Sequence, residues 1–268
     1  MLVKGGKPEA NLGRAVQMIH DAGGQDCQFI VLPECLDLGW MHPSAHDLAQ
    51  PIPGPHTARL SEAAQSAGIY VVAGLTERSR DDLYNAAVLI SPEGEILLKH
   101  RKINEVTTAP KLYSIGDSLG VAKTPLGTVA INICADNFPN SLALAHSLAR
   151  MGAQILLSPT AWAVDADHDN EKTPYGGEWK HSYTTLARLY DMPVVGVSNV
   201  GWIDAGPCEG KKCIGSSLAV DSGGDILLEG PHGEDAESLM VVEVEIKPAV
   251  AAGNATAAML KTKGYEGI

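Results

Sequence analysis

The spacing of apolar residues along the chain changes between helical spacing and short uninterrupted apolar runs. The first such change predicts a helix that leads into a buried strand. From Asn11 to Asp21 the apolar residues recur at the three- and four-residue spacing of an amphipathic helix. The run from Phe29 to Leu32 is apolar without interruption and stops at Pro33, which is typical of a strand buried on both faces. The apolar helix positions are Leu12, Ala15, Val16 and Ile19.

The second half of the chain repeats this order. A helical pattern from Ser141 to Met151 leads into the apolar run Ile155 to Ser158 and then Pro159. The two halves stay in step through one more helix and one more strand. These are predicted at Thr57 to Ala67 and Tyr70 to Gly74 in the first half, and at Glu178 to Tyr190 and Val194 to Ser198 in the second.

Each half then continues into a predicted hairpin around a short polar turn. The hairpin strands are expected at Ala86 to Ile90 and Glu95 to Leu98, and at Ser217 to Val220 and Asp225 to Leu228. Because the strands are apolar runs that alternate with helices, the pattern predicts an α/β protein with two sheets covered by helices.

The repeat also predicts that one strand is incomplete. The strand Val129 to Ile133 precedes the helix of the second half, whereas its counterpart in the first half would fall at or before Met1 to Val3. We therefore expect the first strand to be truncated at the N-terminus, which would weaken one sheet. Since no linker or low-complexity segment interrupts the pattern, residues 1–268 are predicted to form a single domain.

Composition and charge narrow the class of protein. With 45% apolar residues the chain has enough apolar side chains for a large core, and its net charge of −12 argues against nucleic acid as a partner. The longest apolar stretch, Ile69 to Leu75, is far shorter than the roughly 18 residues of a membrane helix, so no membrane partner is expected. The five cysteines are irregularly spaced, which is typical of thiols in a reducing compartment and predicts a cytoplasmic protein.

Cys134 is the most suggestive thiol in the sequence. It follows a predicted strand and precedes a helix expected to start near Ser141, and a side chain at such a turn is well placed to act as a nucleophile. Nearby backbone N–H groups could lower the thiol pKa and bind a developing oxyanion. The alternative is that Cys134 is a small buried apolar residue that closes a strand.

A thiol nucleophile needs a base, and the histidines of this chain show no telling spacing. His100, His146 and His181 are the plausible ones. Glu34 is a second kind of candidate, because a carboxylate at the carboxyl end of a strand is partly desolvated and its pKa moves towards that of a thiol. Lys102 follows a third predicted strand. The structural alternatives are a capping or turn residue for Glu34 and a solvated basic cluster for Lys102.

Together these three residues resemble the nitrilase superfamily of carbon–nitrogen hydrolases, in its amidase-like branch. Leu32-Pro33-Glu34 resembles the glutamate motif of that family, Arg101-Lys102 its lysine motif, and Ile133-Cys134-Ala135-Asp136 its cysteine motif. The three motifs stand in the family's order, 68 and then 32 residues apart. Weaker supporting matches run along the chain at Pro53-Gly54-Pro55, Tyr84-Asn85-Ala86-Ala87, Ser158-Pro159-Thr160-Ala161-Trp162, Ser198-Asn199 and Gly215-Ser216-Ser217.

The resemblance implies an αββα sandwich, a homodimer or higher homo-oligomer, and hydrolysis of a small-molecule amide-type substrate without a cofactor or a metal. It implies that Cys134 attacks the substrate carbon, that Glu34 moves the proton, and that Lys102 and the N–H of Ala135 stabilise the intermediate. Glu105 is the nearest match to the second glutamate that many members use. Trp162, with the loop that follows it, is a candidate to line the substrate pocket.

Three functions remain open on the sequence. The first is hydrolysis of a small linear amide or N-carbamoyl compound, and the second is hydrolysis of a nitrile. The third is a catalytically silent relative that acts as a scaffold, which the presence of Glu34, Lys102 and Cys134 together disfavours.

Overall fold

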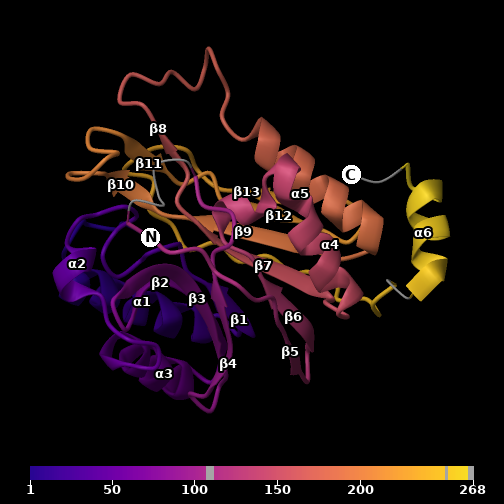
Figure 1. Ribbon diagram of the computed structural model, residues 1–268, viewed down its shortest axis with the longest axis horizontal. Helices are drawn as coiled ribbons and strands as arrows, with labels where there is room; N and C mark the ends of the chain where they lie inside the picture. Colours follow the sequence, from indigo (N-terminus) through magenta and orange to yellow (C-terminus); the bar gives the residue numbers. More distant parts are fainter. Residues whose placement is uncertain (107–111, 251–252, 265–268) are drawn as a thin grey trace.

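Two β-sheets pack face to face at the centre of the molecule, and helices cover the outer face of each (Figure 1). This computed structural model describes residues 1–106, 112–250 and 253–264. One sheet has four strands in the order β1-β2-β3-β4, which are β1 (Phe29–Val31), β2 (Tyr70–Ser79), β3 (Asp82–Ile90) and β4 (Ile96–Arg101). The other has the order β13-β12-β9-β7-β6-β5, formed by β5 (Val121–Thr124), β6 (Gly127–Ile131), β7 (Ile155–Thr160), β9 (Val194–Ser198), β12 (Leu218–Val220) and β13 (Ile226–Glu229).

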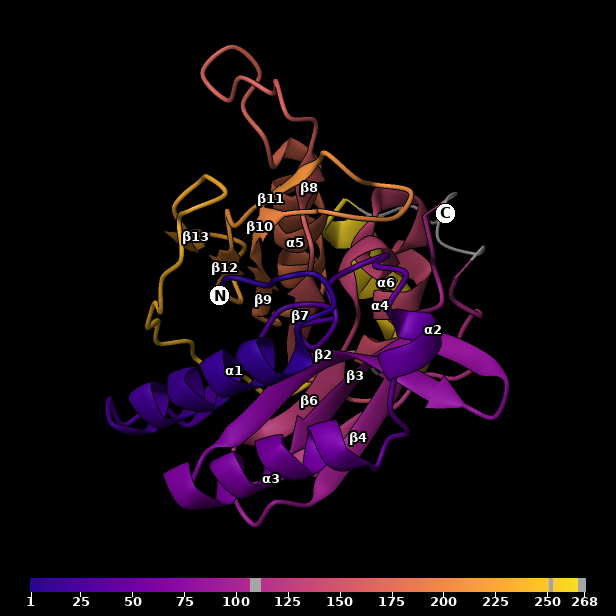
Figure 2. The same cartoon turned by 90° about the vertical axis from the view of Figure 1, so that its left-hand side faces the viewer.

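The helices divide between the two faces in agreement with the predicted αββα sandwich (Figures 1 and 2). The four-stranded sheet is covered by α1 (Pro8–Gly23) and α3 (Pro55–Ala67), and the six-stranded sheet by α4 (Leu142–Arg150) and α5 (Gly177–Tyr190). The other helices are α2 (Ala45–Leu48), α6 (Gly253–Thr262) and two short 3-10 helices, η2 (Cys134–Asn137) and η3 (Pro139–Ser141). A small third sheet contains β8 (Ala163–Val164), β10 (Val200–Trp202) and β11 (Lys212–Ile214).

The internal repeat is confirmed by the strand pairing. In one sheet β1 pairs with β2 in parallel, and β2-β3 and β3-β4 are antiparallel. In the other, β7 pairs with β9 in parallel, and β9-β12 and β12-β13 are antiparallel. Even the register shift in the last hairpin recurs, between Leu89 and Ile90 and between Ala219 and Val220.

Alternate residues of a strand contribute to two different hydrophobic cores, one between the two sheets and one between a sheet and its covering helices. In β2, Val72 faces the six-stranded sheet, whereas its neighbours Val71 and Ala73 pack under α1 and α3. This follows from the two-residue period of a strand, and it explains why a strand between two layers is apolar throughout. Across the sandwich, β2 packs on β7 and β3 on β6.

Several predicted boundaries are wrong by a few residues. The helices α1 and α3 start earlier than predicted because proline occupies their first turn, where its missing N–H costs nothing. The strand β2 runs on to Ser79, past the predicted end at Gly74, because β3 begins at Asp82 and pairs with it along its length. The strand expected at Val129 to Ile133 lies two residues earlier, at β6. Within the described residues, no helix has both the length and the apolar character needed to cross a bilayer.

The central strand β7 offers a direct test of this core. Leu156 is fully buried between the sheets and helices, whereas Leu227 on β13 is 43% exposed. We expect Leu156→Ala to lower the free energy of unfolding by about 2–5 kcal/mol, because it removes buried contacts and leaves a cavity. Leu227→Ala should change it by less than about 0.5 kcal/mol. Urea unfolding followed by circular dichroism measures both, and equal losses would contradict this packing.

Candidate active site

Three predicted site residues meet at the carboxyl ends of strands from both sheets. Lys102 directly follows β4, and its N–H donates to the Asn85 carbonyl at 2.8 Å. Glu34 lies just beyond β1, and its N–H donates to the carbonyl of Thr160, the last residue of β7, at 3.1 Å. Cys134 follows β6 and opens a short 3-10 helix, η2 (Cys134–Asn137). This edge of a sheet is where open α/β folds build their sites.

Glu34 and Lys102 form an ion pair that is closed off from solvent. Lys102 Nζ lies 2.7 Å from Glu34 Oε1, and neither side chain has any exposed surface. Burial alone lowers the pKa of Lys102, but the charges of Glu34, Cys134 and Glu105 outweigh it and raise that pKa well above its ordinary value. The lysine is therefore held as a cation inside the site.

Asn85 on β3 completes the coordination of one oxygen of Glu34. Its side-chain amide donates to Glu34 Oε1 at 2.5 Å, so this oxygen accepts from both Asn85 and Lys102. The other oxygen, Oε2, has no hydrogen bond within the described part of the chain. Glu34 thus keeps one buried lone-pair-bearing oxygen available for a proton.

Cys134 sits in a strained turn and its thiol holds its proton. Its φ of +44° lies in the left-handed region that a residue with a Cβ rarely adopts. Burial, followed by the charge of Glu34, raises the pKa of the Cys134 thiol well above its ordinary value, although Lys102 and the Ala161 N–H oppose the shift. Such a thiol needs a base before it can attack a substrate.

Asp136 fastens the cysteine turn to the lysine loop. One of its oxygens accepts from the N–H groups of Ile103 and Asn104 at 3.1 and 2.8 Å, and the other accepts from Ile133 at 3.0 Å. The second oxygen also contacts His100 Nε2 at 2.8 Å. With four partners, this buried carboxylate keeps Cys134 and Lys102 in fixed relation.

Ala135 is held in place by its carbonyl and leaves its N–H unused by its own helix. The carbonyl accepts from Asn104 Nδ2 and from Ser141 Oγ, both at 2.7 Å. Ala135 is the second residue of η2, so its N–H has no acceptor within that helix. It is next to Cys134 in the chain, where an oxyanion formed on attack by the thiol would develop.

Glu105 reaches the same buried space. Its side chain is 1% exposed, and its Oε2 lies 3.7 Å from Lys102 Nζ. Burial, partly offset by Lys102 and reinforced by Glu34 and Asp136, raises the pKa of Glu105 to about 7. Neither of its oxygens makes a hydrogen bond within the described residues.

A row of aromatic rings borders the cysteine. Trp162 stacks on Trp179 at 4.9 Å between ring centres, and Trp179 stacks on Phe138 at the same distance. Cys134 belongs to the same buried cluster as Trp162, Trp179 and Tyr183, and its 3-10 helix η2 packs against α5. Trp162 is 2% exposed, so it lies within the core rather than at the surface. The loop of residues 165–176 that follows it projects away from the sandwich (Figure 2).

The three candidate histidines differ in their contacts. His100 contacts Asp136, His146 contacts the hydroxyl of Tyr190 at 2.6 Å, and His181 is exposed on α5. The side chain whose charge raises the pKa of the Cys134 thiol is instead the carboxylate of Glu34. Within the described part of the chain, no group of three or more histidine, cysteine, aspartate or glutamate side chains is arranged to hold a metal ion.

Two residues of the site carried no role in the sequence analysis. In the sequence analysis Asn85 appears only as part of a supporting motif, and Asp136 only as the last residue of the cysteine motif. Their roles depend on partners that are distant in the sequence, at positions 34 and 100. A buried polar residue next to a nucleophile is the signal that would have pointed to Asp136.

Comparison with known proteins identifies the family to which this chain belongs. Residues 4–252 match the family model of carbon–nitrogen hydrolases, so this chain belongs to that family. Curated relatives include an omega-amidase from Xenopus tropicalis, 35% identical over 57% of this chain and 58% of its own length. The chain thus spans little more than half the length of that relative. A nitrilase from Pyrococcus abyssi is 30% identical over 90% of this chain and 85% of its own length.

Solved structures of the family share the fold. A carbon–nitrogen hydrolase from Helicobacter pylori aligns with a TM-score of 0.78 at 22% identity, over 88% of this chain and 85% of its own. A Saccharomyces cerevisiae member of the nitrilase superfamily aligns with a TM-score of 0.73 at 24% identity, over 87% and 84% of the two chains.

The raised pKa of Glu105 makes a pH-dependent prediction. Between its ordinary value of 4.5 and about 7, the folded protein holds this proton more tightly than the unfolded chain does. The stability contributed by Glu105 therefore falls as the pH rises through that window, and it stays low above it. We expect Glu105→Gln to stabilise the protein more at pH 8 than at pH 5, by about 2–3 kcal/mol.

Urea unfolding of both proteins at the two pH values measures this difference. Glu93→Gln, at an exposed position in the turn between β3 and β4, is the matched control and should shift stability equally at both. A pH-independent effect of Glu105→Gln would show that Glu105 ionises normally.

Proposed function

We propose that this protein hydrolyses the carbon–nitrogen bond of a small amide through a thioester on Cys134. The observation that carries the proposal is the meeting of a thiol, a carboxylate and a cation in one closed space. Glu34, Lys102 and Cys134 come from different strand ends, and Glu34 and Lys102 are fully buried. Membership of the carbon–nitrogen hydrolase family supports the same chemistry.

In the first step the Cys134 thiol attacks the amide carbon while its proton passes to Glu34. Because burial raises the pKa of this thiol, attack and proton transfer are coupled, and the base must already be adjacent. Oε2 of Glu34 is the acceptor, since Oε1 is occupied by Asn85 and Lys102.

The carbonyl oxygen becomes an oxyanion as the new C–S bond forms. Lys102, kept protonated by its anionic neighbours, and the N–H of Ala135 stabilise that charge. In a site closed off from bulk solvent each such interaction is stronger than it would be in solution. The backbone of Cys134 has a positive φ, and Asp136 holds the neighbouring Ile133 N–H, so the turn that carries the sulfur and the Ala135 N–H is fixed before substrate binds.

Collapse of the tetrahedral intermediate breaks the C–N bond. Glu34 returns its proton to the departing nitrogen, so ammonia or an amine leaves and Cys134 holds the acyl group. Glu34 then takes a proton from a water molecule, which attacks the thioester, and the acid product departs as the thiol is restored. We assign to Glu105, whose Oε2 lies 3.7 Å from Lys102 Nζ, the role of orienting the substrate or this water.

The substrate class we propose is a small linear amide or N-carbamoyl compound. The omega-amidase relatives support the amide, and the buried walls made by Trp162 and Trp179 favour a slim substrate. A nitrile is the second candidate, favoured by the match to the Pyrococcus abyssi nitrilase over 90% of this chain. Ammonia release from matched amide, N-carbamoyl and nitrile series distinguishes these substrates, and release from none would favour a silent scaffold.

Cytoplasmic location and self-association complete the proposal. All five cysteines are unpaired, and four of them are buried, which fits a reducing compartment. We propose a homodimer or larger assembly of this chain, without nucleic acid or membrane as a partner.

Substitution of the three central residues tests the mechanism. With an amide that the wild type hydrolyses, Cys134→Ala should abolish turnover. Glu34→Gln should lower kcat by about 10²–10⁴, because it keeps the shape and removes the proton acceptor. Lys102→Met should lower kcat by about 10²–10³ through loss of the cation that meets the oxyanion. Cys27→Ala, which removes a half-buried thiol, is the matched control and should retain wild-type kcat.

The histidines provide a contrasting test of the same mechanism. His146→Gln and His181→Gln should each keep more than about a tenth of wild-type activity, since neither is assigned a proton transfer. Intact-mass spectrometry and peptide mapping of substrate-treated wild type should find any trapped acyl group on Cys134. An adduct on another cysteine, or a histidine as essential as Glu34, would refute the assignment.

The assembly state can be measured separately. Size-exclusion chromatography with light scattering at micromolar concentration should give at least twice the mass of one chain. A single species with the mass of one chain would refute the proposed dimer without bearing on the chemistry.

A further inference from the structure

A second buried network holds the turn of Cys134, in addition to the contacts of Asp136. Asn132 directly follows β6, and Asn137 is the last residue of η2, so the two asparagines flank the turn. The Asn132 side-chain amide donates to Asn137 Oδ1 at 3.0 Å, and the Asn137 amide donates to Ser158 Oγ on β7 at 2.9 Å. All three residues are completely buried. Together they form a clasp that closes the turn and fastens it to β7.

The clasp encloses a backbone conformation that would not persist by itself. Cys134 lies between the two asparagines and has a φ of +44°. A residue with a Cβ keeps such a φ only where the surrounding contacts determine it. A turn that opened would let Cys134 return to an ordinary φ. That rotation would redirect both its sulfur and the N–H of Ala135.

The strand β7 connects the clasp to the turn of Glu34. The carbonyl of Thr160, at the end of β7, accepts from the Glu34 N–H at 3.1 Å, and Ser158 lies two residues before it on the same strand. β7 is an interior strand of the six-stranded sheet. Asp136 relates Cys134 to the lysine loop, whereas the clasp relates Cys134 to the turn of Glu34.

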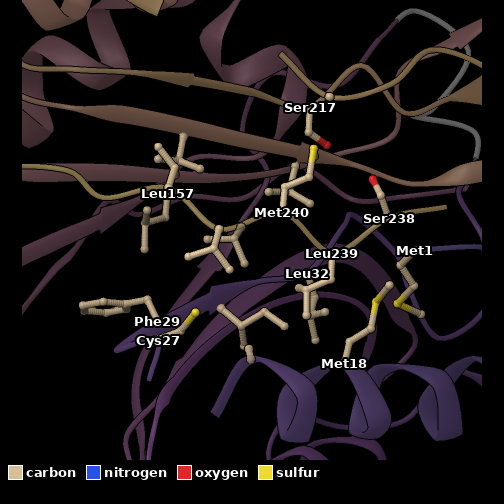
Figure 3. A pocket seen from close by; sticks show the side chains of 18 of the residues that line it. Met1, Met18, Cys27, Phe29, Leu32, Leu157, Ser217, Ser238, Leu239 and Met240 are labelled. Carbon is tan, nitrogen blue, oxygen red and sulfur yellow. The ribbon is translucent and has the colours of Figure 1, made fainter. Parts of the chain in front are cut away.

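The clasp lies on the helix side of β7. Leu157 lines a cavity beside β1, on the side of the four-stranded sheet (Figure 3). Side chains alternate between the two faces of a strand, so Ser158 points to the opposite face, which α4 and α5 cover. The helix η2 packs against both β7 and α5. The clasp is therefore separate from that cavity and belongs to the layer that holds Cys134.

Stability alone does not account for these polar side chains. Asn132 Oδ1 is buried and makes no hydrogen bond to any residue that the structure describes. A buried polar atom without a partner lowers stability, and an apolar side chain of similar shape avoids this loss. Asparagine at this position therefore reduces stability, as residues retained for the geometry of an active site do.

We propose that Asn132 and Asn137 are positioning residues that hold the sulfur of Cys134 in place for proton transfer to Glu34. This inference rests on the proposed hydrolase function. The clasp acts on the substrate only through Cys134, so its loss should affect the rate of thiol attack and leave substrate binding almost unchanged.

Substitution of Asn137 in the complete chain tests this role. With an amide that the wild type hydrolyses, Asn137→Leu should lower kcat by about tenfold or more and change KM by less than about twofold. Asn137→Asp is the conservative variant. Its carboxyl group has the same shape and can accept from Asn132 while it shares a hydrogen bond with Ser158. It should keep kcat within about threefold of wild type.

Thr57→Val is the matched control. Thr57 is 1% exposed, and its hydroxyl makes two hydrogen bonds to the backbone of Gly54 at the start of α3, on the outer side of the other sheet. This variant should lower Tm and keep wild-type kcat. If Asn137→Leu does not fold, Ser158→Ala removes only the outer hydrogen bond of the clasp and should lower kcat to a smaller extent, again at unchanged KM.

Hydrogen exchange reports on the turn without any substrate. The N–H groups of Asp136 and Phe138 donate to the carbonyls three residues before them, at 2.9 and 3.1 Å, so they exchange when the turn opens. Asn137→Leu should accelerate their exchange by about tenfold or more, whereas Thr57→Val should leave it unchanged.

The opposite results overturn the proposal. They are wild-type kcat in Asn137→Leu, an equal loss of kcat in Thr57→Val, a change confined to KM, or unchanged exchange of the two turn amides. If the wild type releases ammonia from no amide, the proposed function fails by itself. Hydrogen exchange then decides alone whether the clasp holds the turn.

Discussion

The buried ion pair between Lys102 and Glu34 is the constraint around which the site is arranged. β1 and β4 are opposite edges of their sheet, so the two side chains must meet across the ends of β2 and β3. Removing either partner would leave an uncompensated charge without solvent, at a cost of about 3–5 kcal/mol. Asn85 on β3 shares Glu34 with the lysine and so ties the middle of the sheet to the pair.

The same desolvation sets the reactivity of the neighbouring groups. Burial opposes ionisation of Cys134 and Glu105, while the lysine stays charged because anionic groups surround it. A thiol in this environment is inert until a base accepts its proton. In the proposed mechanism the thiol therefore depends on the Glu34 carboxylate being close, and a solvated histidine such as His181 has no equivalent position.

The two halves of the repeat contribute different chemistry to one place. The first half supplies Glu34 and Lys102, and the second supplies Cys134 and the aromatic walls. They are joined at the strand ends, where the Glu34 N–H donates to Thr160 and Asp136 accepts from the lysine loop. Among the residues that the structure describes, the repeat is nevertheless unequal, because one sheet has six strands and the other four.

The local pattern of the sequence determined the elements, since the period of buried positions depends on neighbours along the chain. It predicted α1, β7 and the hairpins, and the order of Glu34, Lys102 and Cys134 predicted the family. The sequence pattern did not predict that α1 and α3 start at Pro8 and Pro55, because a proline in the first turn is not part of the apolar period. It also did not predict that β2 continues to Ser79, because that extension depends on pairing with β3. Only the tertiary structure decided that His100 contacts Asp136, that Asn85 holds Glu34, and that Glu105 is buried. These are electrostatic relations between residues distant in sequence, and their strength depends on exclusion of water, which no local pattern encodes.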